Sequence, residues 1–398
     1  MSDGAPEKFA SDTQLIRAGR DARYTQGVVN PPVYHASTCT FETLAEFDER
    51  LKHPDDGLYY GRRGTPTIWA LEDALTGMHA DAAGTKLFPS GVAALAGAFL
   101  AVCRAGDHVL IADTAYEPTR VLANGVLKRM GVECEFYDPL IGGDISGLIR
   151  DDTRAIFMES PGSLTFEVQD VPAIVAAAKK RDVTTIVDNT WATPLLFPSL
   201  QHGVDIEVQS LTKFIVGHSD AMMGSVTANK ALWPRVKATA LRLGQCAGPD
   251  DVFLALRGVR TLSMRLHRHG ETALKTAAAV QMHSAVADVL CPGLPGNPHH
   301  DLWQRDFLGY SSLFSIVLNG GERHHLAAMV DDLRLFSMGF SFGGFESLIL
   351  PVSPETVRSA TQWSAPGPVL RIHCGLEDAD DLIADLMAGL DRFQKAAA

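Results

Sequence analysis

Short apolar runs alternate with helical segments between about residues 80 and 230, and this alternation limits the possible folds most strongly. Four of the runs have the length and composition of strands buried on both faces, namely 108–112, 155–158, 184–187 and 204–208. Helical stretches such as 171–180 lie between them. Such strands separated by helices are typical of a mainly parallel sheet covered by helices. The sequence therefore predicts an α/β fold built on a large sheet domain.

Changes in this pattern divide the chain into three predicted parts. Residues 1–57 show little periodicity and predict an extended N-terminal arm, which needs another surface to pack on and so indicates an oligomer. Residues 58–255 form the predicted sheet domain. A long helix over 251–269 is expected to lead into a smaller α+β C-terminal domain, residues 256–398.

Composition excludes several classes of protein. The net charge of −12 over 398 residues argues against a protein that binds nucleic-acid backbones. The most apolar stretch, 87–103, contains a proline and glycines and predicts a buried helix rather than a membrane span. Residues 1–7 lack the basic and apolar regions of a secretory signal. Six dispersed cysteines without a Cys-x-x-Cys pair indicate reduced thiols in a cytoplasmic enzyme, and no histidine pair has metal-ligand spacing.

Polar side chains follow each of the four predicted strands. In parallel sheets, ligands bind beyond the carboxyl ends of the strands, so these residues are expected to converge. A lysine such as Lys213 would, alone, more often be an ordinary surface residue. The residues after the strands are Asp113 and Tyr116, then Glu159, then Asp188, Thr190 and Trp191, and finally Ser210, Thr212 and Lys213.

A small-residue turn at 88–95 enters an apolar helix. The unpaired N–H groups and the positive end of a helix favour an anion there, at Ser90, Gly91 and Val92. The sequence contains no Gly-x-Gly-x-x-Gly and no Walker loop, so a dinucleotide or nucleoside triphosphate site lacks its usual motif.

For two further sets of residues, the sequence leaves both a functional and a structural role open. Tyr60 and Arg62 lie in a glycine-rich segment that suits either a phosphate or a solvated turn before a helix over 68–75, with Thr67 as its predicted cap. Arg371 lies in a predicted strand, 368–374, and needs a partner. That partner is either a structural carboxylate or the carboxylate of a substrate.

The combination of a lysine amine, a strand-end carboxylate, an anion site and an aromatic ring suits pyridoxal 5′-phosphate (PLP). The aldehyde requires a lysine, and the pyridine nitrogen requires an anion. The phosphate requires N–H and hydroxyl donors, and the ring requires an aromatic face. Lys213 fits the aldehyde and Asp188 fits the pyridine nitrogen. The 90–92 turn fits the phosphate, and Tyr116 fits the ring.

The chain resembles the Cys/Met-metabolism family of PLP-dependent enzymes of fold type I, and within it the bacterial cystathionine β-lyases. The matching stretches occur in order from about residue 20 to residue 390. As a set they are far more specific than any single motif. They are 60–67, 115–118 (Ala-Tyr-Glu-Pro), 187–192 (Val-Asp-Asn-Thr-Trp-Ala), 212–214 with 217–222, 256–262 (Leu-Arg-Gly-Val-Arg-Thr-Leu) and 343–348.

The resemblance implies a role for each candidate residue. Lys213 would bind the cofactor covalently and move protons, and Tyr116 would stack on the ring and assist proton transfer. Asp188 would pair with the pyridine nitrogen, and Arg371 would bind the substrate carboxylate. The phosphate would be held by Ser90, Gly91, Val92, Ser210 and Thr212, with Tyr60 and Arg62 supplied by a neighbouring subunit. Ser341, Phe342 and Tyr60 would lie near the substrate. The family commonly forms tetramers as pairs of such dimers.

The implied reaction is α,β-elimination, which converts L-cystathionine to homocysteine, pyruvate and ammonia in methionine biosynthesis. Alternatives within the family are a cysteine or cystine desulfhydrase and a cystathionine γ-lyase or γ-synthase. A non-catalytic PLP-binding regulatory protein is a more remote one. The chain departs from the β-lyase pattern at Phe342, where tryptophan is usual, and at Leu211, where a small residue is usual. We expect both departures to affect substrate preference and neither to remove a catalytic group.

Overall fold

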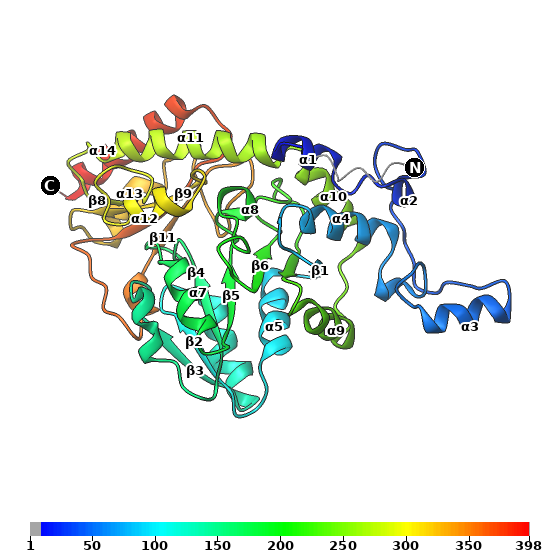
Figure 1. Cartoon of the computed structure of the whole chain (residues 1–398). Coiled ribbons are helices and arrows are strands. Elements are labelled where there is room, and N and C mark those ends of the chain that lie inside the picture. Colours follow the sequence, from blue (N-terminus) through cyan, green and yellow to red (C-terminus); the bar gives the residue numbers. More distant parts are fainter. Residues whose placement is uncertain (1–8, 398) are drawn as a thin grey trace.

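A seven-stranded sheet forms the centre of the larger part of the molecule (Figure 1), in a computed structural model that describes residues 9–397. Its order is β1-β7-β6-β5-β4-β2-β3. The neighbours from β3 to β6 run parallel, and β7 runs antiparallel to both β6 and β1. The predicted mainly parallel sheet is thereby confirmed. The strands are β1 (Gly84–Phe88), β2 (His108–Ala112), β3 (Glu133–Tyr137), β4 (Thr153–Glu159), β5 (Thr184–Asp188), β6 (Ile206–Ser210) and β7 (Gly224–Ala228).

Helices cover both faces of this sheet. They are α4 (Pro66–Thr76), α5 (Gly91–Val102), α6 (Glu117–Leu122), α7 (Val171–Lys179), α8 (Thr193–Leu196) and α9 (Trp233–Leu243). Along β2, Val109 and Ile111 join the apolar cluster that contains α5, whereas Leu110 and Ala112 join the cluster that contains α4 and α7. All five residues of β2 are buried. Burial on both faces explains why the sequence shows a continuous apolar run here.

Helix α4 begins slightly earlier than expected. Thr65, rather than Thr67, is its cap, since Thr65 Oγ1 accepts a hydrogen bond from Ile68 N at 3.5 Å. Pro66 occupies the first turn, where its missing N–H costs nothing. The Thr67 hydroxyl instead lies between two backbone groups of the N-terminal segment, donating to Pro32 O and accepting from Tyr34 N, both at 2.8 Å.

A second, five-stranded sheet has the order β10-β11-β12-β9-β8. All its pairs are antiparallel except β10 with β11. Its strands are β8 (Val286–Leu290), β9 (Leu313–Leu318), β10 (Ser337–Met338), β11 (Leu348–Val352) and β12 (Val369–His373). The helices of this part are α11 (Leu262–Val280), α12 (His300–Asp306), α13 (Arg323–Val330) and α14 (Ala379–Ala397), and α10 (Pro249–Val259), which precedes them, packs against α4. The exact domain boundary near residue 255 stays a prediction.

The single helix expected over 251–269 is two helices, so that prediction was wrong. Helix α10 ends at Val259, and α11 begins at Leu262 and runs to Val280 across the top of Figure 1. The chain leaves the helical conformation at Thr261, with φ −114° and ψ 9°. Apolar periodicity continues through this corner, which explains why the pattern did not reveal it.

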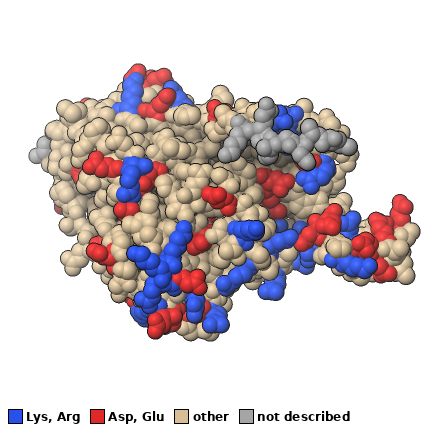
Figure 2. All heavy atoms as spheres, viewed as in Figure 1, with Lys and Arg blue, Asp and Glu red and all other residues tan. Residues whose placement is uncertain are grey.

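The N-terminal arm contains three helices, α1 (Ser11–Arg17), α2 (Ala22–Thr25) and α3 (Leu44–Lys52), where an extended chain was expected. Helix α3 projects away from the rest of the molecule and carries both acidic and basic side chains (Figures 1 and 2). Thr43 caps it by accepting from Glu46 N at 3.1 Å. None of its residues is buried, and its apolar side chains Leu44, Phe47 and Leu51 are exposed in the single chain.

Residues 1–7, for which no secretory signal was expected, lie outside the described residues. Between residues 9 and 397, none of the helices has both the length and the apolar character needed to cross a membrane. The six cysteines are free thiols in this structure. The stretch 87–103, predicted to be a buried helix, consists of the end of β1 followed by α5.

A buried carboxylate joins the two sheets. Asp113, directly after β2, is fully buried and accepts hydrogen bonds from the backbone N–H groups of Ser359, Ala360 and Thr361 at 2.8 to 3.1 Å. Arg120 Nη1 lies 3.0 Å from Asp113 Oδ1. Although burial raises the pKa of Asp113, the hydrogen bonds from Ser359 and Thr361 bring it below its usual range. This carboxylate therefore holds a segment of the smaller part onto the larger one.

We expect Asp113→Ala to lower the unfolding free energy by about 3–5 kcal/mol, because it leaves Arg120 and three N–H groups without their buried partner. Urea unfolding of the cofactor-loaded protein measures this loss. The control is Asp151→Ala, which removes an exposed pair with Arg181 at 3.1 Å. That variant should lose about 1 kcal/mol or less. Equal losses in the two variants would contradict the role assigned to Asp113.

Candidate active site

A cavity of about 230 Å³ lies at the carboxyl ends of β4, β5 and β6. It collects candidate residues from six separate stretches of the sequence. Tyr60 and Arg62 do not line it. The predicted residues that do are Ser90, Gly91, Val92, Tyr116, Asp188, Ser210, Thr212, Lys213, Ser341, Phe342 and Arg371. The strand-end rule of parallel sheets thus brings together the residues for which it was applied except Asp113, which does not line this cavity and binds the 359–361 segment instead.

Lys213 lies in a tight turn after β6. Its backbone N–H donates to Ser210 O at 3.2 Å, and its carbonyl accepts from Gly217 N at 2.8 Å. Its side chain reaches the cavity, where Nζ donates to Ser341 Oγ at 2.7 Å. Burial, with a further contribution from the positive charge of Arg371, lowers the pKa of Lys213 to about 8. A substantial fraction of this amine is therefore neutral and nucleophilic near pH 8.

Asp188, the last residue of β5, is 8% exposed and faces the same cavity. Its Oδ1 accepts a hydrogen bond from Thr190 N at 3.0 Å. Burial raises the pKa of this carboxyl group, and among residues 9–397 no basic side chain forms an ion pair with it. A buried carboxylate without a cation requires one from a ligand, and a protonated pyridine nitrogen meets that need.

The first turn of α5 forms an anion site. Ser90 caps the helix by accepting from Ala93 N at 3.1 Å, and the described residues provide no acceptor for the N–H groups of Gly91 and Val92. A Cβ atom at Gly91 would lie 2.8 Å from Ser210 Cβ, so only glycine allows this approach. The helix N-terminus and the Ser210 hydroxyl therefore lie together, as a phosphate requires.

Arg371, in the middle of β12, enters the cavity from the second sheet. Its Nη2 donates to Ser341 O at 3.0 Å, and no carboxylate in residues 9–397 pairs with it. This favours a substrate carboxylate over a structural salt bridge as its partner. Phe342 lies beside both cations, with its ring centroid 5.1 Å from Lys213 Nζ and 5.9 Å from Arg371 Cζ. The departure at Phe342 is therefore located at the substrate end of the cavity.

Two residues near the cofactor position received no role from the sequence. Glu159 ends β4 in register with Asp188, and its Oε2 accepts from Tyr116 N at 2.7 Å. Burial and the charge of Asp188 raise the pKa of Glu159 well above its usual range. Trp191 also lines the cavity and packs edge-on against Tyr310 with ring centroids 5.0 Å apart. Their positions at the end of β4 and after β5 led the sequence analysis to expect both at this edge, without a chemical role for either.

Apolar residues complete the cavity wall and were missed entirely. They come from loops and from β9, and no chemical group marks them in the sequence. They include Leu164, Phe166, Met222, Leu313 and Phe340. Leu211, the second departure from the β-lyase pattern, is fully buried and does not line the cavity.

Tyr60 and Arg62 lie outside this cavity, on the exposed surface of the same chain. Tyr60 is 43% exposed. Arg62 Nη1 donates to Leu241 O at the end of α9, at 2.7 Å. Within one chain, neither residue lines the cavity that Lys213 enters.

The residues of the cavity fit PLP. Lys213 offers an amine of lowered pKa, and Asp188 offers a buried carboxylate that lacks a cation. The turn at Gly91 offers unpaired N–H groups beside the Ser210 hydroxyl. Tyr116 offers an aromatic ring at the cavity wall. When bound, PLP would be held by these groups and would supply an electron-accepting ring.

The pKa of Lys213 leads to a test. Because only the neutral amine attacks an aldehyde, the rate at which cofactor-free protein binds added PLP covalently should rise with pH and level off above a midpoint near 8. The appearance of visible absorbance between pH 6 and pH 10 measures this rate. Arg371→Gln should move the midpoint upward, since it removes a positive charge that lowers the lysine pKa. A midpoint near about 10.4, the ordinary value for lysine, would contradict the electrostatic account.

Comparisons with known proteins agree with this site. Residues 12–391 match the family model for Cys/Met metabolism PLP-dependent enzymes. Cystathionine beta-lyase MetC of Escherichia coli (strain K12) is 44% identical over 389 residues, which cover 96% of this chain and 98% of that protein. A putative cystathionine beta-lyase of Rhizobium johnstonii is 45% identical over 393 residues, covering 97% of each.

A solved structure of similar fold is that of cystathionine gamma synthase from Xanthomonas oryzae pv. oryzae. It has a TM-score of 0.89 and 31% sequence identity, and the match covers 98% of this chain and 99% of that one. Both the sequence and the fold thus extend the similarity over nearly the whole chain. The chain belongs to the Cys/Met metabolism family of PLP-dependent enzymes, and its cofactor is PLP.

Proposed function

We propose that the protein is a cystathionine β-lyase. It converts L-cystathionine and water to homocysteine, pyruvate and ammonia, a step that supplies methionine biosynthesis. The observation that carries this proposal is the joint position of Lys213, Asp188 and Arg371 around one cavity. The two relatives reported above, named cystathionine beta-lyase and putative cystathionine beta-lyase, support the β-lyase branch, because they are 44% and 45% identical, against 31% for the gamma synthase.

The side chains divide the work as follows. Arg371 binds the substrate carboxylate through two parallel hydrogen bonds and thereby orients the Cα–H bond. Lys213 Nζ accepts the Cα proton and later returns a proton, with Ser341 Oγ holding the amine in place at 2.7 Å. PLP supplies the electron-accepting ring for the electrons left on Cα. Asp188 would keep the proton on the pyridine nitrogen, and Tyr116 would stack on the ring and move a proton at the substrate amine.

The alternatives in the same family need the same groups. A γ-lyase or γ-synthase would bind the amino acid through Arg371 and use Lys213 in the same way. A cysteine or cystine desulfhydrase would differ only in the group that leaves from Cβ. Phe342, which lies between Lys213 and Arg371, is the position where this preference is expected to depend on shape.

Product analysis on L-cystathionine tests the proposal. We expect pyruvate and homocysteine in equal amounts, whereas 2-oxobutyrate and cysteine would contradict it. The value of kcat/KM on L-cystathionine should exceed that on L-cysteine and L-cystine; the reverse order would make the protein a desulfhydrase.

Lys213→Ala tests the role of the lysine. We expect at least about a 1,000-fold loss of turnover, since covalent and proton-transfer roles vanish together. The control is Lys230→Ala, which removes an exposed lysine outside the cavity and should keep activity near that of the wild type. Near-normal turnover in Lys213→Ala would refute the assignment.

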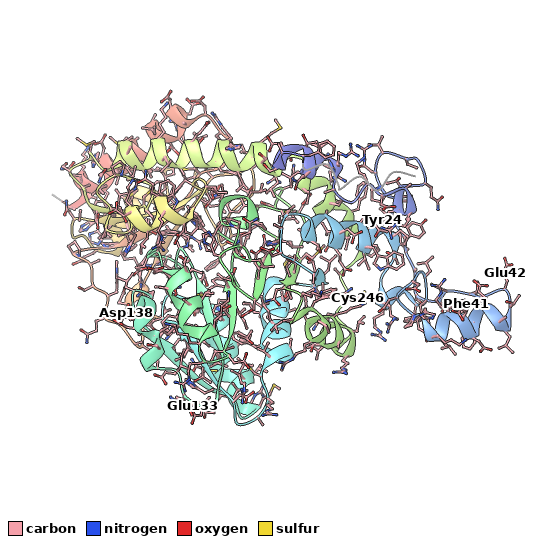
Figure 3. The ribbon with its side chains drawn as sticks, viewed as in Figure 1. Tyr24, Phe41, Glu42, Glu133, Asp138 and Cys246 are labelled. Carbon is pink, nitrogen blue, oxygen red and sulfur yellow. The ribbon has the colours of Figure 1, made fainter. Side chains whose placement is uncertain are left out.

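We further propose that the active unit is a dimer in which Tyr60 and Arg62 bind the phosphate of the other subunit. Tyr60 forms an antiparallel bridge with Thr38, shortly before the projecting part of the arm, where Figure 3 marks Phe41 and Glu42. On that part Leu44 is 74% exposed and Leu51 is 49% exposed, as expected for a surface that a second copy covers. A tetramer of two such dimers and a cytoplasmic location are part of the same proposal, and the six free thiols support the location.

Mixed oligomers test the shared site. Lys213→Ala and Arg62→Ala should each be inactive alone, yet unfolding and refolding them together should restore about a quarter of wild-type activity, because half of the dimers would be mixed and carry one intact site of two. No recovery would mean that Arg62 acts in its own chain. Arg63→Ala serves as the control, since Arg63 pairs with Asp55 at 2.7 Å, and it should be active by itself.

A further inference from the structure

One stretch of the family resemblance, 256–262, has no role in the site described so far. It forms the corner between α10 and α11, outside the cavity. Gly258 lies directly against the chain that follows Lys213, and a Cβ atom there would lie 2.1 Å from Ile215 O and 2.5 Å from Val216 O. The corner therefore packs backbone to backbone against the lysine turn.

Arg265, in the first turn of α11, bridges these two pieces of backbone. Its side chain is buried, with the residue 6% exposed. Nη1 donates to Phe214 O at 2.7 Å, and Nη2 donates to Gly258 O at 2.8 Å and to Ile215 O at 3.5 Å. Nε donates to Thr261 Oγ1 at 3.1 Å. One guanidinium group thus binds carbonyls on both sides of the contact.

No carboxylate in residues 9–397 pairs with Arg265. Its burial lowers its pKa to about 10, which shows that the charge is held at a cost. Apolar packing would join α10 to the sheet domain without that cost. Unlike an apolar side chain, a guanidinium group donates hydrogen bonds in fixed directions. Two of these bonds end on the carbonyls of Phe214 and Ile215, the residues directly after Lys213.

The turn is packed tightly on this side, since the Phe214 ring also contacts His269 of α11, with ring centroids 5.6 Å apart. Gly217 has a φ of 70°, and a Cβ atom there would lie 1.9 Å from Arg265 Nη1. The Phe214 ring, whose carbonyl Arg265 holds, packs against Phe342 with centroids 5.7 Å apart. A displacement of this turn would therefore move both Lys213 and the substrate end of the cavity.

We propose that Arg265 is a positioning residue for Lys213, which holds the lysine turn so that Nζ keeps its place toward the cofactor and the substrate Cα. This inference rests on the proposed role of Lys213. By this inference, the corner at 256–262 helps to position Lys213, in addition to joining α10 and α11.

The chain contains a matched control in Arg260. Its Nη1 donates to three backbone carbonyls, Leu15 O at 2.8 Å, Ile16 O at 3.2 Å and Ala18 O at 2.6 Å. Like Arg265, it has no carboxylate partner within residues 9–397. It ties α1 to the same corner and does not contact the lysine turn, so it provides a comparable structural tie without the proposed function.

The experiment compares Arg265→Met and Arg260→Met in the cofactor-loaded enzyme. In the absence of substrate, we measure the rate at which the lysine-bound cofactor is released and the pH dependence of its visible absorbance. For Arg265→Met we expect about tenfold faster release, a shifted pH midpoint and about a tenfold lower kcat with KM changed less than about threefold. Arg260→Met should lower the melting temperature but leave the release rate, kcat and KM within about twofold of the wild type. Its pH midpoint should equal that of the wild type.

Equal effects in the two variants, or wild-type behaviour of Arg265→Met, would overturn the proposal. If Arg265→Met does not fold, Arg265→Lys decides the question, because one ammonium group keeps the charge but cannot bridge carbonyls on both sides. We expect Arg265→Lys to release cofactor at least about threefold faster than the wild type, and an unchanged rate would refute the role. The release and absorbance measurements use no substrate, so a failure of the proposed reaction, seen in the wild-type products, is distinguishable from a failure of this inference.

Discussion

The parallel pairing of β4, β5 and β6 is the constraint on which the rest of the structure depends. Glu159 lies in register with Asp188, and Asp188 lies in register with Val208, two residues before the end of β6. All three strands therefore end at one edge, and the chain that leaves β6 carries Lys213 directly beyond Asp188. A shift of one residue in this register would turn Asp188 to the opposite face of the sheet.

Burial then gives this edge its electrostatic character. It lowers the pKa of Lys213 to about 8 and raises those of Asp188 and Glu159. Burial thus disfavours the charged form of each group, and a ligand of complementary charge would stabilise that form. Under the proposed function, PLP would bring a pyridine nitrogen for Asp188 and a phosphate for the turn at Gly91, and the substrate would bring a carboxylate for Arg371. The site is thus built for ligands rather than for internal ion pairs.

The second sheet completes the cavity and must be held in place. Arg371 and Ser341 reach Lys213 from that part of the chain, and the buried Asp113 carboxylate fastens the 359–361 segment to the first sheet. Arg265 acts at the opposite side of Lys213, where α11 meets the lysine turn. The position of one amine therefore depends on contacts from both parts of the molecule.

The sequence by itself determined the mainly parallel sheet, because strands buried on both faces leave continuous apolar runs such as 108–112. It also determined the strand-end residues Asp188 and Lys213, whose order along the chain follows the order of the strands. Only the tertiary structure decided that α10 and α11 are separate helices, that Glu159 binds Tyr116 N, and that Arg265 holds the carbonyls after Lys213. These features rest on contacts between distant segments, which local periodicity does not record. The role of Tyr60 and Arg62 depends on more than the tertiary structure. In a single chain they lie outside the cavity, and a second subunit is proposed to bring them to it.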